Sequence, residues 1–198
     1  MKIISDKAQK TGKHETKEQW WADNGVEILR YPLPVGDYIL VNDKVQNVLD
    51  RKAKRDVAVK KMDFLGTYDV CVDSKASIQE IINNLCGKGH DRVRDEAILA
   101  QNNGIKLYFL IEDEGGWVSR RKNVYNRSCT CVEDLFSWVN PRLWIWQGGK
   151  QKYPYATRGS TLAKTMITFA DRYGCEFVFC KPKDAGKKVV ELLMGENK

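Results

Sequence analysis

Two aspartates and a lysine beside apolar stretches of the chain have the residue types that phosphodiester hydrolysis requires. Asp37 follows Gly36 at the start of a strand-like stretch, and Asp73-Ser74-Lys75 closes the stretch that begins at Tyr68. Residues two apart in a strand project from the same face, so we expect Asp73 and Lys75 to point the same way. Mg²⁺ and Mn²⁺ prefer carboxylate oxygens, and an ammonium group can orient water or stabilise charge on a phosphorane. The pattern predicts a hydrolytic centre on Asp37, Asp73 and Lys75, with the two aspartates as metal ligands.

The surroundings of the Asp-x-Lys triplet strengthen this prediction, because an isolated triplet of this kind is more often a surface salt bridge. The triplet ends an apolar strand, and it precedes a helix whose start is marked by Ser77 and Glu80 at the spacing of a capping box. The apolar residues of this helix recur on one face, at Ile78, Ile81, Ile82 and Leu85. A reaction centre needs such rigid flanking elements.

A second Asp-x-Lys triplet lies at Asp50-Arg51-Lys52, with Asp56 four residues after the lysine. We prefer residues 73–75, because only Val48 and Leu49 precede the second triplet directly and no apolar helical periodicity follows it. We interpret residues 42–67 as an inserted, exposed segment, either a hairpin or a short helix. Its basic residues form either a solvated charged face or a DNA-contacting arm.

Strands alternate with helices along the remaining chain, and this predicts one α/β domain over residues 1–198 with a central mixed sheet and helices on both sides. We expect strands at 2–5, 26–31, 35–41, 68–75, 105–111 and 175–180. We expect helices at 17–24, 77–86, 91–101, 132–139, 161–173 and 185–194. Residues 113–160 are rich in loops, at 113–127 and 147–160.

The composition is that of a basic globular protein. Thirty-three Lys and Arg residues face 26 Asp and Glu, which gives a formal charge of +7 and fits either a nucleic-acid partner or a merely basic protein. No apolar run approaches the roughly 20 residues that span a bilayer, so we expect no membrane partner. The N-terminus turns polar after two apolar residues, so we expect no signal peptide and reduced cysteines in the cytoplasm. The cysteine spacing does not favour a zinc site.

The order of these motifs resembles the XPF-type nuclease family, which has a restriction-endonuclease-like fold. The chain is most similar to the small versions encoded by phages and prophages of Gram-positive bacteria. The family has an acidic residue after its first strand, a Gly-Asp element, a Glu-Arg-Lys strand followed by an acidic residue, and an Arg-x-x-x-Gln helix. The matching positions here are Asp6, Leu33-Pro34-Val35-Gly36-Asp37-Tyr38, Val72-Asp73-Ser74-Lys75, Arg92-Val93-Arg94-Asp95-Glu96 and the next strand, Leu110-Ile111-Glu112. The resemblance covers nearly the whole chain apart from 42–67 and about 113–160.

Several positions depart from the family pattern. Asp73 replaces the glutamate, Ser74 replaces the arginine, and the helix motif ends in Glu rather than Gln. Ala8 stands where an arginine commonly follows the first acidic residue, and the late acidic position falls on Gln79. The helix-hairpin-helix module of full-length relatives has no counterpart after residue 194, so their substrate preference does not carry over.

The resemblance implies a Mg²⁺- or Mn²⁺-dependent DNA endonuclease and allows a homodimer, and we expect branched or flap DNA as the substrate. The implied catalytic residues are Asp37, Asp73, Lys75, Asp6 and Glu96, and the candidate DNA contacts are Arg92, His90, Arg51, Lys52 and Arg158. Arg158 leads into a helix N-terminus, where backbone N–H groups attract phosphate. Trp138, Trp144 and Trp146 either stack on bases or, as we prefer, cover the edge of the sheet. Two alternatives are a Holliday-junction resolvase on the same fold and a DNA-binding module without the chemistry.

Overall fold

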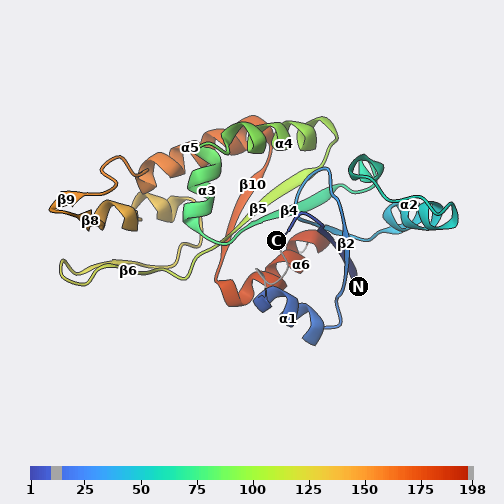
Figure 1. The fold of residues 1–198 in the computed structure, drawn as a ribbon, viewed down its shortest axis with the longest axis horizontal. Coiled ribbons are helices and arrows are strands. Elements are labelled where there is room, and N and C mark those ends of the chain that lie inside the picture. The colour runs from blue at the N-terminus through green and yellow to red at the C-terminus, as the bar shows by residue number, and fades with distance from the viewer. Residues whose placement is uncertain (10–14, 196–198) are drawn as a thin grey trace.

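A six-stranded mixed sheet forms the centre of the protein, whose computed structural model describes residues 1–9 and 15–195 (Figure 1). Its strands are β1 (Lys2–Asp6), β2 (Glu27–Tyr31), β3 (Tyr38–Leu40), β4 (Val70–Lys75), β5 (Lys106–Glu112) and β10 (Glu176–Cys180). They lie in the order β10-β5-β4-β3-β1-β2. The β1–β2, β4–β5 and β5–β10 pairs are parallel, whereas β3 is antiparallel to both β1 and β4. The predicted mixed α/β sheet is confirmed.

Helices cover both faces of this sheet, as predicted (Figure 1). One face packs against α3 (Ile78–Leu85), α4 (His90–Asn102) and α5 (Gly159–Tyr173), and the other packs against α1 (Glu15–Asp23) and α6 (Ala185–Met194), which follows the short 3₁₀ helix η4 (Pro182–Asp184). The alternation of β4 divides its side chains between the two cores, with Cys71 facing α3 to α5 and Val72 facing α1 and α6. Asp73 and Lys75 share the face of Cys71, whereas Ser74 shares the face of Val72.

The start of α3 explains how the end of β4 is held. The Ser77 side chain accepts a hydrogen bond from the backbone N–H of Glu80 at 3.2 Å, as the capping pattern predicted. The Glu80 carboxylate accepts from the backbone N–H of Ala76, one residue before the helix cap. The helix therefore begins three residues after Lys75, and the end of the strand is fixed by hydrogen bonds rather than left as a free loop.

Residues 42–67 form helices, which was one of the two predicted alternatives for this segment, but the segment is not wholly exposed. The segment contains α2 (Asp43–Lys54), which the Asn42 side chain caps, and the 3₁₀ helix η1 (Lys61–Phe64). Four apolar side chains of these two elements lie in the larger core, at Val45, Val48, Leu49 and Phe64, whereas Met62 is exposed. Three apolar residues at i, i+3 and i+4 are enough to anchor α2, and the many charged residues around them hide this periodicity in the sequence.

The segment 113–160 is more ordered than the predicted loops. Strands β6 (Gly116–Ser119) and β7 (Val124–Asn126) form an antiparallel hairpin, and β8 (Trp146–Gln147) pairs with β9 (Lys150–Gln151). The helix expected at 132–139 is a single 3₁₀ turn, η2 (Glu133–Phe136), and a second such turn, η3 (Pro141–Trp144), follows. In Figure 1 these elements extend away from one end of the sheet, beyond α3.

The structural elements give no support to a membrane-spanning role. Within residues 1–9 and 15–195, every helix is too short or too polar to traverse a bilayer.

Candidate active site

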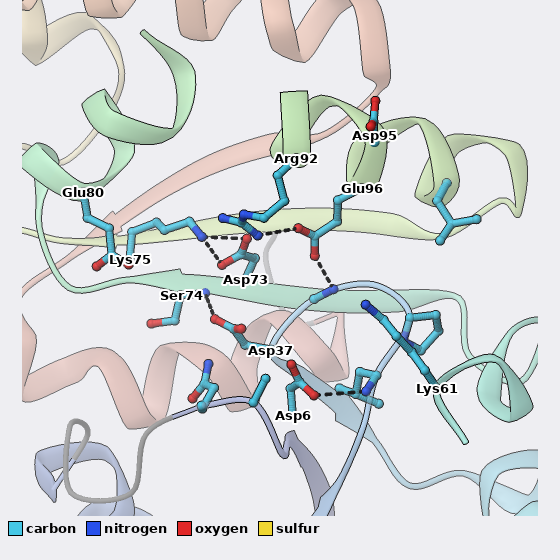
Figure 2. A pocket seen from close by; sticks show the side chains of 16 residues that line it. Asp6, Asp37, Lys61, Asp73, Ser74, Lys75, Glu80, Arg92, Asp95 and Glu96 are labelled. Atoms are coloured by element: carbon cyan, nitrogen blue, oxygen red, sulfur yellow. Dashed lines mark hydrogen bonds and ion pairs between the residues drawn. The ribbon is translucent and has the colours of Figure 1, made fainter. Parts of the chain in front are cut away.

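A cleft of about 730 Å³ opens where β4, the turn before β3 and α4 meet (Figure 2). It contains all five side chains that the sequence predicted as catalytic, and Arg92 also lines it. The predicted catalytic residues in the cleft are Asp6, Asp37, Asp73, Lys75 and Glu96. Segments up to 90 residues apart in sequence are thus brought to one cavity, with most of their side chains pointing into it.

Asp73 and Lys75 form a buried ion pair on one face of β4. Their exposed fractions are 2% and 5%. The Lys75 Nζ lies 2.6 Å from Oδ1 and 2.8 Å from Oδ2 of Asp73, but only the contact with Oδ2 has hydrogen-bond geometry. Among the described residues, no donor forms a hydrogen bond with the buried Oδ1. A buried carboxylate oxygen without a hydrogen bond is costly, and it is a ready ligand for a cation.

Asp37 is held by the backbones of both neighbouring strands. Its N–H donates to Val72 O and its C=O accepts from Asp6 N–H, each at 2.8 Å. Its Oδ2 accepts a hydrogen bond of 2.8 Å from the backbone N–H of Ser74. Gly36 is required before it, because φ is +75° there and a Cβ would lie 2.8 Å from the Cβ of Cys71. The Gly-Asp pair therefore places the carboxylate directly beside the end of β4.

Glu96 reaches the same turn from α4. Its Oε1 accepts a hydrogen bond of 2.8 Å from the backbone N–H of Gly36, and its Oε2 lies 3.5 Å from Nη1 of Arg92. Arg92 is exposed at the rim and also donates to the buried side chain of Asn84 at 3.1 Å. Glu96 thus fixes the turn that carries Asp37 and adds a third carboxylate to the cleft.

Two of these three carboxylates, Asp37 and Glu96, have raised pKa values. Burial raises the pKa of Asp37 well above its usual range, and the charge of Asp73 raises it further. Burial and Asp73 likewise raise the pKa of Glu96. Burial alone would lower the pKa of Lys75, but the negative charges of Asp73 and Asp37 outweigh it and the pKa is raised. Lys75 is therefore a protonated ammonium, surrounded by more negative charge than it neutralises.

Asp6 and Gln9 support Asp37 from β1 and the turn that follows it. The Asp6 Oδ1 accepts a hydrogen bond of 3.1 Å from the backbone N–H of Leu33, so Asp6 holds the segment that leads to the Gly-Asp pair. The Gln9 side chain forms hydrogen bonds with Asp37 and with the hydroxyl of Tyr38. Sequence reasoning predicted Asp6 and missed Gln9, which carries no motif of its own.

Sequence reasoning also missed a buried lysine on the opposite face of β4. Lys17 of α1 is 2% exposed, and its Nζ lies 2.6 Å from both the Ser74 hydroxyl and Oε1 of Glu112. The charged residues around Lys17 are typical of a solvated helix face, so only tertiary packing identifies it. This network holds Ser74, whose backbone N–H in turn holds Asp37.

Four of the five candidate DNA contacts lie outside the cleft, and Arg92 alone lines it. Arg51 is exposed on α2, where Lys52 pairs with Asp63 at 2.7 Å. His90 begins α4 with its side chain 45% exposed, and Arg158 is exposed before α5. Sequence reasoning missed Lys61, which does line the cleft.

The comparisons with known proteins concern the fold and the family of the chain. A search of the curated proteins finds no match. Among solved structures, the fold is similar to that of XPF from Aeropyrum pernix, with a TM-score of 0.53 and 14% sequence identity. The alignment covers 100% of this chain and 66% of that chain, so this protein spans just under two thirds of that chain's length. At this identity the likeness shows the fold alone.

A family model for the ERCC4 domain matches residues 11–192, which is most of the chain. It confirms the resemblance to XPF-type nucleases that the Gly-Asp and Asp-x-Lys motifs predicted. The protein therefore belongs to the ERCC4-domain family.

Proposed function

We propose that this protein is a divalent-metal-dependent DNA endonuclease that hydrolyses phosphodiester bonds in branched or flap DNA. The observation that carries the proposal is the meeting of Asp37, Asp73 and Glu96 around the ammonium of Lys75 in one cleft. Two or more carboxylates beside a lysine, at the end of a strand, have the chemistry that phosphate hydrolysis needs.

The acidic side chains of the cleft fit a hard divalent cation. As they stand, the described residues include no group of three or more His, Cys, Asp or Glu side chains arranged as a complete ligand set. The buried Oδ1 of Asp73 without a hydrogen bond and the raised pKa values of Asp37 and Glu96 nevertheless mark a site with excess negative charge. Asp37 and Asp73 would hold the ion, and their oxygen donors favour Mg²⁺ or Mn²⁺ over Zn²⁺. When bound, such an ion polarises the phosphate and makes hydroxide available near neutral pH.

The cationic side chains of the cleft have distinct roles in this proposal. Lys75 keeps its proton, so it acts as a charge that stabilises the transition state and not as a general base. Arg92 lies exposed at the rim, where a guanidinium can bind a DNA phosphate in bidentate fashion. Asp6 and Glu96 position the turn that carries Asp37.

The experiment is a cleavage assay on labelled duplex, single-stranded, 3′-flap, 5′-flap and four-way-junction DNA, each with Mg²⁺, Mn²⁺ or EDTA. We expect cleavage of a flap or branched substrate with either metal and none in EDTA. Asp73→Asn, which removes a charge at nearly constant volume, should reduce the rate about a hundredfold or more without loss of DNA binding. Paired symmetric cuts in the four-way junction would identify a resolvase instead. Binding without cleavage under every condition would identify a non-catalytic module.

The remaining features of the proposal concern setting and assembly. We propose a cytoplasmic protein, since all six cysteines are free thiols, of which Cys71, Cys129 and Cys175 are buried. A homodimer and a phage or prophage origin rest on the sequence resemblance. Analytical sedimentation of the purified chain tests whether it is a homodimer.

A further inference from the structure

The segment Gly116–Arg158, called here the aromatic arm, carries all the exposed aromatic side chains of residues 1–9 and 15–195. They are Trp117, Tyr125, Phe136, Trp146, Tyr153 and Tyr155, with exposed fractions from 37% to 96%. Trp146 is 64% exposed, so the preferred interpretation that this tryptophan covers the sheet edge is wrong. Exposed rings gathered on one projecting segment mark a binding surface, because single exposed apolar residues are normally scattered.

The aromatic arm also carries most of the net positive charge of the chain. It contains eight Lys or Arg residues and two Asp or Glu residues, whereas the whole chain has a formal charge of +7. The cations lie among the rings: Arg142 Cζ is 5.6 Å and Lys152 Nζ is 5.5 Å from the centroid of the Tyr153 ring. Charge complementarity therefore favours a polyanion that also presents flat apolar faces.

A hollow of about 310 Å³ joins the aromatic arm to the end of the catalytic strand. Trp117, Trp138 and Arg142 line it on the side of the arm, and Ser77 and Gln79 at the start of α3 line the other side. Ser77 is only two residues beyond Lys75, so the hollow lies beside the strand end that carries the proposed reaction centre. Its lining combines aromatic rings with a guanidinium, and both stack on nucleobases.

The hollow is held rigid by the fold of the aromatic arm. Trp117 and Tyr125 are cross-strand partners in the β6–β7 hairpin, with ring centroids 5.1 Å apart in an edge-to-face arrangement. Asn126 ties the hairpin to Val139, donating through Nδ2 at 2.7 Å and accepting through Oδ1 at 3.0 Å. Gly115, directly before the β6–β7 hairpin, packs tightly against it, since a Cβ there would lie 2.6 Å from Asn126 O. A surface fixed in this way loses little conformational entropy on binding.

From these observations we propose that the aromatic arm binds single-stranded DNA beside the cleft, with unpaired bases stacked on its rings and one base in the hollow at Trp117. The proposal deepens the proposed function and rests on it, because it names single-stranded DNA as the part of the substrate that this surface binds. A duplex stacks its bases internally and offers phosphates alone to such a surface, so exposed rings contribute binding energy only to an unpaired strand.

The test measures binding of the full chain, in EDTA, to a fluorescein-labelled oligothymidine and to a blunt duplex of equal length. We expect Trp117→Ala and Trp146→Ala each to weaken binding of the oligothymidine by about 5- to 100-fold, since stacking of one base on a ring contributes that much. Duplex binding should change by less than about twofold. Ile167→Ala is the matched control, because Ile167 is 40% exposed on α5, outside the aromatic arm, and should leave both affinities unchanged.

The outcomes separate this inference from its rivals and from the proposed function. Equal losses for both DNAs, or no loss for either, overturn it. A dimer that Trp117→Ala dissociates while oligothymidine affinity stays the same also overturns it, and makes a second copy of the chain the occupant. Ring-dependent binding by a protein that cleaves no DNA supports this inference and contradicts the proposed function. Cleavage of flap DNA by a protein whose oligothymidine affinity does not depend on the aromatic rings supports the proposed function and contradicts this inference. Trp146 lies outside the lining of the hollow, so its variant keeps the test valid if Trp117→Ala fails to fold.

Discussion

Replacing Asp37 by asparagine should make the protein more stable and less active at the same time. Asparagine has nearly the same volume, and its amide oxygen can still accept the hydrogen bond from Ser74 N–H that the carboxylate accepts at 2.8 Å. The charge that is lost is one that burial and the neighbouring Asp73 disfavour. The variant therefore removes an electrostatic cost while keeping the local structure.

The direction of the pH dependence follows from the raised pKa of Asp37. The folded state holds the Asp37 proton at pH values where the unfolded chain has already released it, so the wild type loses stability as pH rises through the folded-state pKa. Below the unfolded pKa the carboxyl is protonated in both states, and the asparagine variant gains nothing. Above the folded-state pKa the gain is largest, on the order of 1 kcal/mol, which shifts Tm by about 2 to 4 °C for a chain of this length.

Thermal melts in EDTA at several pH values, together with a cleavage assay, test the prediction. Mg²⁺ should make the wild type more stable than Asp37→Asn. At a Mg²⁺ concentration of about 100 times the Kd, binding stabilises the wild type by about 2.7 kcal/mol and the variant much less. Asp50→Asn is the matched control, since Asp50 is exposed on α2 and accepts one hydrogen bond from Gln46. A variant that melts below the wild type at alkaline pH in EDTA, or whose gain grows toward acid pH, would refute the reasoning.

Three further predictions follow from the charges of the chain. Asp73→Asn and Lys75→Ala should each slow single-turnover cleavage by about 10²- to 10³-fold. The matched changes Asp50→Asn and Lys52→Ala on α2 should leave the rate nearly intact, and the opposite result would favour the triplet at Asp50-Arg51-Lys52 as the catalytic motif. DNA affinity should fall steeply with salt, with a log–log slope of about −0.9 per phosphate neutralised, and salt-independent binding would contradict an electrostatic interface. Lys17→Met should reduce the free energy of unfolding by about 3 kcal/mol in a denaturant titration, because it removes the ammonium partner of the part-buried Glu112 carboxylate, and an unchanged midpoint would contradict that role.

The sequence predicted the sheet and the centre of the site because both depend on strong local signals. The apolar runs of β4 and β5 are too continuous for a loop, and the capping signal at Ser77 marks where the first of them must end. The side-chain alternation of a strand then places Asp73 and Lys75 together, at contact distances of 2.6 and 2.8 Å. The Gly-Asp pair was predicted within a strand at 35–41, but β3 begins at Tyr38 and the positive φ of Gly36 places the pair in the turn before it.

The features that the sequence could not predict depend on tertiary packing. The apolar face of α2 is three residues wide and precedes Asp50 rather than following it, so the second triplet does lie on a helix, although Asp50 is exposed there and remains outside the cleft. Lys17 resembles any other solvated lysine until Glu112 and Ser74 surround it. The β6–β7 hairpin has strands of only four and three residues, and Trp117 pairs with Tyr125 between them, a weaker signal than the glycines and basic residues beside them.

Ser74, one of the positions that depart from the family pattern, takes part in hydrogen bonds on both faces of β4. It stands where the resemblance expects an arginine, and Lys17 places an ammonium 2.6 Å from its hydroxyl. The buried Lys17 ammonium therefore lies beside the position of Ser74, where β4 itself carries no cationic residue. The Glu112 carboxylate, 2.6 Å from Lys17 Nζ, neutralises this charge. The backbone N–H of Ser74 meanwhile holds Asp37 on the side of the cleft. Because one residue takes part in both networks, a change at Lys17 should alter the position of Asp37 as well as the stability of the fold.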